Sequence, residues 1–371
     1  MFSVIKKGFT TVRLFASVHT IVQNNYTIIV LLHHYCVTYD NVCKSNALRY
    51  YYHASGLNWT MGDTTLGSRV FALSDLHVDY KENRKLLDGW PDKKYSNDVL
   101  VVAGDVTDNM TLLETTLKGL QLKFRQVFFV PGNHELWMRS DDKSTDSIGK
   151  FHAILALCAR LGVGTSPTRV SLSAGDHVWL VPLFSWYATP EEDPDNSFYV
   201  RPSAGEDEAR QRDIWMDNHM CVWPTPTDGQ TRADYFADLN RSAVERSYDA
   251  PVVSFSHFVP RRELIGASDA DRAAVDRERA RRGLAPFTGT HQGAAGFNFT
   301  RYAGSYQLEQ QVSWLQPTVH VFGHQHRNRD RVIAGVRYVA HCLGSPNDQR
   351  DGWTWGVSEW DGPKQVWPQK T

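Results

Sequence analysis

Apolar residues of this chain gather in short runs that end abruptly in polar residues. From Arg69 onward these runs are rich in Val and Phe, and their length and β-branched content predict buried strands. Five of the runs end in Asp, Asn or His, at residues 69–77, 98–108, 126–135, 251–258 and 318–326. Two more runs, 177–187 and 331–341, predict strands without an acidic or Asn ending.

Helical patterns lie between several of the predicted strands. Residues 111–122, 147–162 and 305–316 show helical periodicity, and Gly162 is expected to end the second of these helices. This alternation of strands and helices predicts an α/β fold in which helices cover the faces of a sheet. Ligands of open α/β sheets bind outside the carboxyl ends of the strands, so the polar endings are expected to gather at one edge.

The same pattern predicts one main domain at residues 66–362, with a leader at 1–65 and a tail at 363–371. The first 39 residues contain no Asp or Glu but do contain Lys and Arg, which is typical of an organelle transit peptide. A disordered extension or a mis-assigned start explains the same composition. Polar stretches at 188–250 and 262–303 are interpreted as insertions on loops above the strand ends, where binding surfaces are usually built.

Composition narrows the class of protein. The 371 residues carry a formal net charge of −1, which argues against a nucleic-acid partner. No apolar run approaches the roughly 18–20 residues of a membrane span. We therefore expect a soluble protein, cytoplasmic or, with a transit peptide, organellar. The five cysteines include no C-x-x-C pair and indicate neither a disulfide framework nor a zinc ribbon. The oligomeric state stays open.

Polar residues at the strand ends form the candidate site. In chain order they are Asp75, His77, Asp105, Asn133, His134, His257, His324 and His326. Each alone has an ordinary explanation, such as a helix cap or a turn. Together they bring imidazole and carboxylate groups to one edge, and these groups suit Mn, Fe or Zn. Seven of these eight residues as ligands would exceed the needs of one ion. Two ions about 3.5–4 Å apart need a shared carboxylate, and Asp105 is central in the order.

Five short motifs that contain these residues resemble those of the calcineurin-like metallophosphoesterase superfamily. They are "DLH" (75–77), "GDVTD" (104–108), "GNHE" (132–135), His257 and "GHQH" (323–326). All five occur in order, over about residues 69–345. The resemblance implies a four-layer α/β/β/α sandwich, in which two mixed sheets pack face to face and are flanked by helices.

The resemblance also implies a dinuclear metal centre and its ligands. One transition-metal ion would be held by Asp75, His77 and His326, the other by Asn133, His257 and His324, and Asp105 would bridge them. His324 and His326 would therefore serve different ions although only Gln325 separates them, with Gln325 pointing away. Gly323 has no side chain, so it is expected to let the backbone turn and approach the ions closely.

Further residues receive catalytic or substrate-binding roles. His134 would be the catalytic histidine, which stabilises the phosphoryl oxygens or protonates the leaving group. Asp108 and Glu135 would orient imidazole rings. Asn133 and His134 would contact the substrate. Arg327, which follows the H-x-H, either contacts the substrate phosphate or is ordinary surface charge.

These roles imply metal-dependent hydrolysis of a phosphate ester. Two cations lower the pKa of a bridging water until hydroxide exists near neutral pH, and they neutralise the phosphate oxygens. The blocks "SDLHVD" and "GDVTDNM" lack the Gly and Arg typical of protein Ser/Thr phosphatases. A phosphorylated small molecule, monoester or diester, is therefore the expected substrate. The alternatives are a non-catalytic protein-binding scaffold of the same fold and a nuclease.

Overall fold

The computed structural model describes most of the chain after residue 67 and four strands before it. The described ranges are 68–173, 176–201, 212–224, 229–287, 297–352, 354, 356 and 362–368, with strands among residues 5–45. The chain divides into two compact units, Met1–Thr65 and Leu66–Thr371. Each unit is described by itself.

The first unit contains an antiparallel sheet in the region predicted as a leader. Its strands, in sheet order, are β1 (Ile5–Lys7), β2 (Thr10–Gln23), β3 (Tyr26–Tyr39) and β4 (Val42–Ser45). The transit-peptide function of this region stays a prediction.

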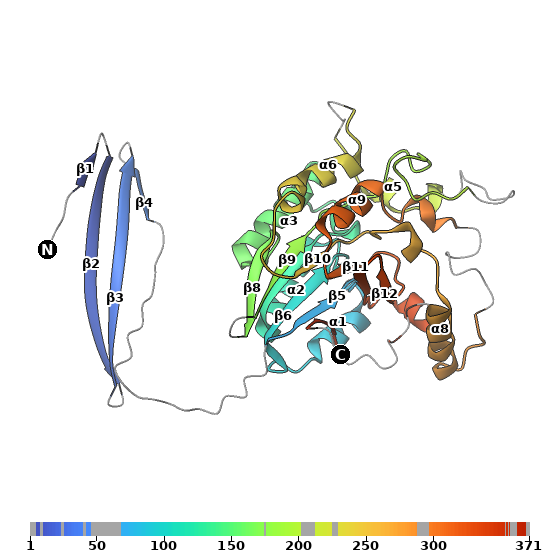
Figure 1. The fold of residues 1–371 in the computed structure, drawn as a ribbon, viewed down its shortest axis with the longest axis horizontal. Coiled ribbons are helices and arrows are strands. Elements are labelled where there is room, and N and C mark those ends of the chain that lie inside the picture. Colours follow the sequence, from blue (N-terminus) through green and yellow to red (C-terminus); the bar gives the residue numbers. More distant parts are fainter. Residues whose placement is uncertain are drawn as a thin grey trace. The chain divides into compact units, whose positions relative to one another are not determined.

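The second unit contains two mixed sheets (Figure 1). The smaller sheet has the order β14-β5-β6-β7, with strands β5 (Val70–Leu73), β6 (Tyr95–Ala103), β7 (Phe124–Val130) and β14 (Lys364–Trp367). Strands β5, β6 and β7 are parallel, and β14 pairs antiparallel with β5. The domain therefore extends to Trp367, beyond the predicted boundary at residue 362.

The larger sheet has the order β12-β13-β11-β10-β9-β8. Its strands are β8 (Thr168–Ser173), β9 (Asp176–Pro182), β10 (Val252–Phe255), β11 (Val319–Phe322), β12 (Arg329–Ile333) and β13 (Val336–Ala340). The four inner strands are parallel, and the edge strands β8 and β12 are antiparallel to their neighbours. Their carboxyl ends therefore meet at one edge, as the carboxyl ends of β5, β6 and β7 do.

The two sheets pack face to face because both faces of the strands are apolar. Along β6, Val99 and Val101 belong to a cluster that includes Val253 of β10 and Val321 of β11, so these side chains fill the space between the sheets. The alternate residues of β6, such as Leu100, belong to the cluster that includes the helices. Side chains of a strand alternate between its two faces, and two apolar faces must be covered by two different layers.

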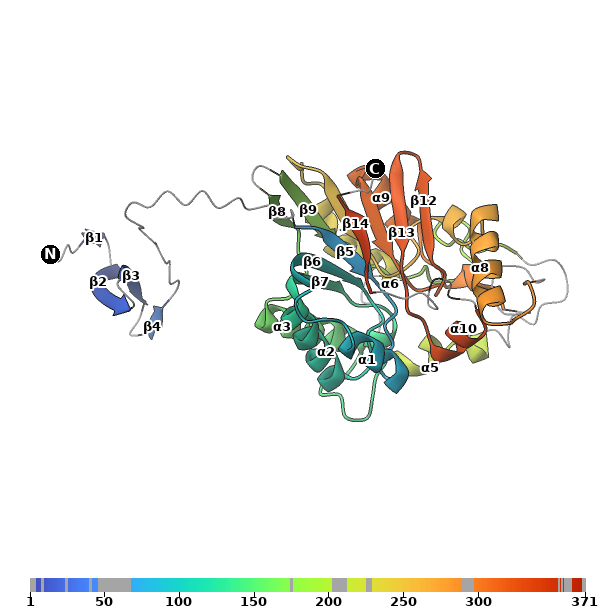
Figure 2. The same ribbon diagram turned by 90° about the horizontal axis from the view of Figure 1, so that it is seen from below.

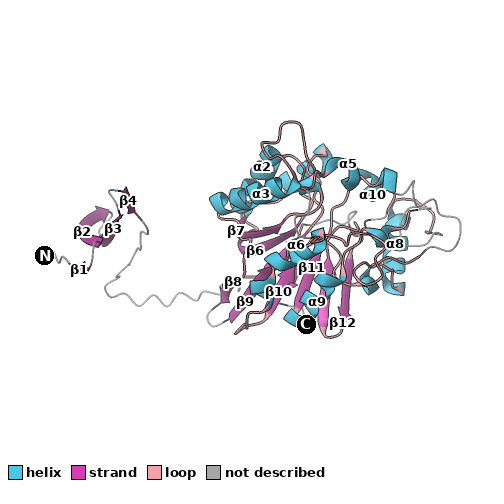
Figure 3. Ribbon diagram, turned by 90° about the horizontal axis from the view of Figure 1, so that it is seen from above, coloured by secondary structure: helices cyan, strands magenta, loops and turns pink. Residues whose placement is uncertain are grey.

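Helices cover the outer face of each sheet, which completes four layers. The helices α1 (Lys81–Asp88), α2 (Met110–Lys123) and α3 (Ser147–Leu161) lie beside the smaller sheet (Figure 2). The helices α6 (Arg232–Leu239) and α9 (Tyr306–Leu315) lie beside the larger one (Figure 3). Gly162 ends α3 with a φ of 76°, which confirms the predicted cap. The predicted α/β/β/α sandwich is also confirmed.

The described part of the chain contains further helices and turns. They are α5 (Asp217–Met220), α7 (Arg241–Val244), α8 (Asp269–Arg281), α10 (Pro346–Arg350) and the 3-10 turns His134–Leu136, Arg262–Leu264 and Phe299–Arg301. Among the described residues, no helix has the length and apolar composition needed to cross a bilayer.

Two predicted segments differ from the structure. Residues 331–341 were expected to form one strand, but they contribute to β12 and β13, which form a hairpin. Its turn is made by Ala334 and Gly335, with φ angles of 49° and 83°. Segment 188–250 was expected to lie on a loop, but Phe236 of α6 is 1% exposed and belongs to the core. Part of this segment is therefore the helical layer of the larger sheet.

Candidate metal centre

The seven predicted ligands lie just beyond the carboxyl ends of five strands. Strands β5, β6, β7, β10 and β11 are followed by Asp75 and His77, by Asp105, by Asn133, by His257, and by His324 and His326. All are buried except His326, which is partly exposed. Both sheets thus contribute to one site, since their strand ends meet at the same edge.

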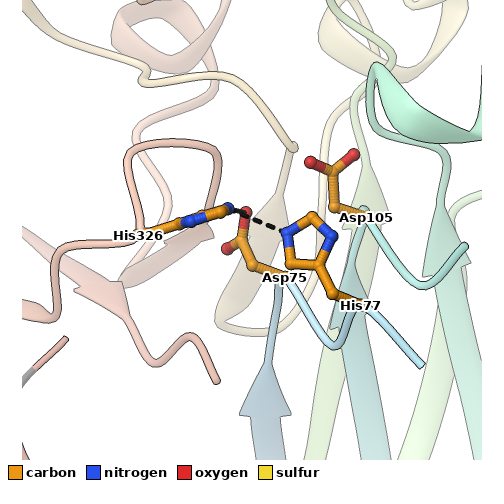
Figure 4. A group of neighbouring side chains, drawn as sticks. All are labelled: Asp75, His77, Asp105 and His326. Atoms are coloured by element: carbon orange, nitrogen blue, oxygen red, sulfur yellow. Dashed lines mark hydrogen bonds and ion pairs between the residues drawn. The ribbon is translucent and has the colours of Figure 1, made fainter. Parts of the chain in front are cut away.

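Four of these residues form a first group of candidate ligands (Figure 4). Asp75, His77, Asp105 and His326 each offer one atom, and these atoms lie within 4.8 Å of one another. Nε2 of His77 lies 2.8 Å from Nε2 of His326. The same His326 atom lies 3.5 Å from Oδ1 of Asp75.

A second group shares Asp105 with the first. Asp105, His257 and His324 offer atoms within 4.8 Å of one another. Oδ1 of Asn133 lies 3.1 Å from Nε2 of His257 and 3.1 Å from Nδ1 of His324. His324 and His326 therefore belong to different groups, and between them Gln325 turns away to donate to the carbonyl of Ile265 at 2.9 Å.

Two histidine rings of the second group are fixed by backbone carbonyls. Nδ1 of His257 lies 2.9 Å from the carbonyl oxygen of Ala103, and Nε2 of His324 lies 2.9 Å from that of Tyr302. A carbonyl only accepts hydrogen bonds, so these nitrogens donate. The opposite nitrogen of each neutral ring then presents a lone pair to the group, as a metal ligand must.

His326 is held by a carboxylate that the sequence analysis missed. Its Nδ1 lies 2.7 Å from Oδ2 of Asp348, so Nε2 faces the first group. Asp348 also closes a capping box with Ser345 at the start of α10. The S-x-x-D spacing could have predicted that helix start. It could not have predicted that the same carboxylate contacts a ring 22 residues earlier in the chain.

Electrostatics favours a cation at this site. Burial opposes charge on His257 and His326, but nearby carboxylates raise the pKa of both imidazoles to about 9. For His257 these carboxylates are Asp105 and Asp75. For His326 they are Asp348, Asp75 and Asp105. Burial lowers the pKa of His77 and His324 well below the ordinary value, so those two rings are neutral. Buried carboxylates beside imidazole rings form a donor set that fits bound transition-metal ions.

Backbone conformation at the site is strained. Positive φ angles occur at Asp75 (51°), His77 (41°), Asp105 (54°), His324 (73°) and His326 (53°). Only two other non-glycine residues of the described chain share this feature. Left-handed conformations of non-glycine residues are unfavourable and concentrate at functional sites.

Glycines allow the close approach of these loops. A Cβ atom on Gly323 would lie 2.6 Å from Oδ2 of Asp75, and one on Gly104 would lie 2.5 Å from Nδ1 of His257. The predicted close approach at Gly323 is thus present. The predicted turn differs, because His324 rather than Gly323 takes the left-handed conformation.

Glu135 holds the backbone of two ligand loops instead of an imidazole ring. Its Oε1 accepts from the backbone N–H groups of Val106 and Thr107, at 2.6 and 3.0 Å. Its Oε2 accepts from those of Asp105 and Gly132, at 2.9 and 2.6 Å. The carboxylate is fully buried and therefore joins the loop after β6 to the loop after β7.

His134 lies at the open side of the site. Its backbone N–H donates to Oδ1 of Asp105 at 3.0 Å, and its Nε2 lies 3.8 Å from Oδ2 of that residue. The His134 side chain is 25% exposed, and its ring stacks on Trp137 with centroids 3.7 Å apart. It can therefore reach a molecule that enters from the surface.

The carboxylate of Asp108 contacts an arginine side chain. It accepts from Nη1 of Arg139 at 3.0 and 3.3 Å. No contact between Asp108 and His134 is found in the part of the chain that the structure describes. The catalytic role of Asp108 stays a prediction.

A pocket of about 220 Å³ opens onto the two groups. Arg327 lines it and is 9% exposed, and burial lowers the pKa of its guanidinium to about 10, so it remains charged at neutral pH. Trp215 and Phe299 also line the pocket. These two aromatic residues come from segments 188–250 and 262–303, so both predicted insertions reach the site.

The fold and the site define a class of protein. The sequence model described as "Calcineurin-like phosphoesterase" matches residues 68–261, more than half of the chain. This chain belongs to the calcineurin-like phosphoesterase family, so the resemblance seen in the sequence is confirmed. Members of this family are hydrolases with dinuclear metal centres.

One known sequence and one crystal structure of this family are similar to this chain. The chain is 28% identical over 301 residues to "[Acyl-carrier-protein] phosphodiesterase PptH" of Mycobacterium tuberculosis, over 78% of this chain and 82% of that protein. The crystal structure of Phosphopantetheinyl Hydrolase (PptH) from the same organism has a TM-score of 0.58 and 20% identity. The similarity covers 82% of this chain and 97% of the chain in that crystal structure, so the two proteins share a fold.

Proposed function

We propose that this chain is a metal-dependent phosphodiesterase that removes a phosphopantetheine group from a carrier protein. The observation that carries the catalytic part is the pair of ligand groups that share Asp105 beneath an open pocket. The substrate is supported by the similarity to the acyl-carrier-protein phosphodiesterase of Mycobacterium tuberculosis, which extends over 78% of this chain.

The seven residues are proposed to hold two transition-metal ions, drawn from Mn, Fe or Zn. Asp75, His77 and His326 would bind one, Asn133, His257 and His324 the other, and Asp105 both. When bound, such ions supply hydroxide near neutral pH and neutralise phosphate oxygens. The nitrogen and oxygen donors, with ring tautomers set by acceptors behind them, support this assignment.

Residues around the groups would bind the ester and move its proton. Arg327 would donate to phosphate oxygens, because it lines the pocket and carries N–H groups. Asn133 also lines the pocket, but its NH₂ group donates to Asp217. His134 would donate a proton to the leaving oxygen, since its ring lies at the open side. Trp215 and Phe299 would contact the organic part of the substrate.

A protein-linked diester replaces the small-molecule substrate expected from the sequence. His134 is partly exposed, as a group that meets the ester of a long arm on a second protein would have to be. The scaffold alternative is disfavoured because all the ligands gather. A nuclease is disfavoured by the net charge of −1.

One assay tests both parts of the proposal. Purified protein with Mn, Fe or Zn ions is incubated with phosphopantetheinylated acyl carrier protein, and the mass of the carrier is followed. Small phosphodiesters and phosphomonoesters are assayed in parallel. The expected result is loss of the phosphopantetheine mass, abolished by chelator and by Asp105→Ala. If small diesters or monoesters are hydrolysed and the carrier is not, the substrate assignment is wrong. If no phosphoester is hydrolysed with any of the three metals, the catalytic assignment is wrong.

A further inference from the structure

Segment 188–250 reaches the metal centre through one buried carboxylate. Asp217 begins the short helix α5 and is 2% exposed. Its Oδ1 accepts from Nδ2 of Asn133 at 2.8 Å and from Nε1 of Trp137 at 2.7 Å. One oxygen atom thus contacts a proposed metal ligand and the ring that stacks on His134.

Backbone hydrogen bonds hold this carboxylate in place. The N–H of Met138 donates to the carbonyl of Met220 at 2.7 Å, and the N–H of Ser147 donates to that of Val222 at 2.7 Å. These bonds tie α5 and the residues after it to the chain that follows Asn133. The contact with Asn133 is therefore supported on both sides by fixed backbone.

The chemistry of the contact sets the direction of the Asn133 amide. An amide offers a carbonyl oxygen on one side and an NH₂ donor on the other, whereas a carboxylate only accepts. The NH₂ group must therefore face Asp217. The Oδ1 atom then faces His257 and His324, at 3.1 Å from each ring nitrogen. The reversed amide would present N–H donors, which cannot bind a cation.

The same oxygen anchors the ring beside the proposed catalytic histidine. Trp137 and His134 stack at 3.7 Å with an angle of 29° between their planes. The indole N–H bond to Asp217 fixes the rotation of Trp137 within this stack. Asp217 itself does not line the pocket beside the two groups, so it acts through its two partners.

We infer that Asp217 is a positioning residue, which points the Asn133 oxygen at the second metal site and fixes Trp137 against His134. The inference rests on the proposed metal assignment. When a residue that hydrogen-bonds to a metal ligand is removed, metal binding typically weakens by about 10–100-fold. The loss should be confined to the site that contains Asn133, His257 and His324, since the Asn133 oxygen contacts the ring nitrogens of His257 and His324.

The test is titration of metal-stripped protein with Mn²⁺, followed by isothermal calorimetry. The wild type should bind two ions. Asp217→Ala should weaken one of the two binding steps by about 10–100-fold, and Asn133→Ala should weaken the same step. Asp217→Asn keeps an acceptor oxygen of the same size, so it should recover most of the affinity that Asp217→Ala loses. Asp213→Ala, on the same segment and exposed, is the matched control and should change nothing.

The double variant of Asn133 and Asp217 distinguishes positioning from general support. If Asp217 acts through Asn133, Asn133→Ala with Asp217→Ala should lose no more affinity than Asn133→Ala alone. Equal weakening of both binding steps in Asp217→Ala overturns the inference, and so does wild-type affinity in that variant. If the wild type still binds two ions, the proposed metal assignment is unaffected by either result. A wild type that binds fewer than two ions overturns both.

Discussion

Replacing Glu135 by Gln tests whether a buried carboxylate holds the two ligand loops together. The substitution keeps the size of the side chain, so it opens no cavity. In the wild type, each carboxylate oxygen accepts from two backbone N–H groups. Gln keeps one oxygen, so two of the four N–H groups would face an NH₂ group whichever way the amide turns.

The loss can be estimated from these four hydrogen bonds. Burial raises the pKa of Glu135 to about 7, so unfolding is compared above that pH, where the carboxylate is charged. A hydrogen bond to a charged group contributes about 1.5–3 kcal/mol to stability. Removing two of them should therefore lower the free energy of unfolding by about 3–6 kcal/mol. Whole domains have about 5–15 kcal/mol, so the expected loss is a large fraction of the stability.

Urea unfolding of the metal-free protein, followed by tryptophan fluorescence, measures this loss. Glu245→Gln is the control, since Glu245 is exposed and its replacement should change the free energy of unfolding by about 0.5 kcal/mol or less. Mn²⁺ affinity should also fall in Glu135→Gln, because the loops that carry Asp105 and Asn133 lose their connection. A destabilisation below about 1 kcal/mol would show that these N–H groups do not depend on the charge, and the reasoning would be refuted.

Four further predictions concern the metal centre and the two units. Asp105→Ala should lose both ions, because Asp105 belongs to both ligand groups; elemental analysis that still finds about two ions per chain would contradict the sharing. His134→Ala should keep its metal content and slow turnover by about 10²–10⁴-fold, whereas loss of metal would make His134 a ligand. Asp348→Asn should weaken one Mn²⁺ binding step by about 10–100-fold through His326, and unchanged calorimetric titrations would show that this ring needs no partner. Removal of residues 1–65 should leave a folded, active enzyme, because the chain divides after Thr65; an insoluble or inactive product would contradict that division.

The order of strands and polar endings in the sequence was enough to predict an α/β fold and the residues that gather, and the family resemblance added the four-layer sandwich. The five apolar runs with polar endings end close to where their strands end, and parallel strands bring their carboxyl ends to one edge. Asp75, Asp105 and His257 therefore meet although they are far apart in the chain. Local signals also predicted the end of α3 at Gly162, where a left-handed cap needs no side chain.

Other features of the fold have weak local signals. The hairpin turn at Ala334 and Gly335 interrupts an apolar run, and an Ala in a left-handed conformation is not expected from propensity. The strand β14 is short and lies in a segment predicted as a tail, and only its pairing with β5 makes it part of the sheet.

The tertiary structure alone decided which carboxylates orient the metal ligands from behind. Neither Asp217 nor Asp348 stands at the end of a predicted strand. Asp217 contacts Asn133, and Asp348 contacts His326, only because separate segments pack together. Asp108, by contrast, stands in a matching motif but contacts Arg139. A motif reports the residues that a strand end must carry, whereas a hydrogen-bond partner depends on the distance between two side chains in space. That distance is set by the packing of the whole domain, which no local pattern contains.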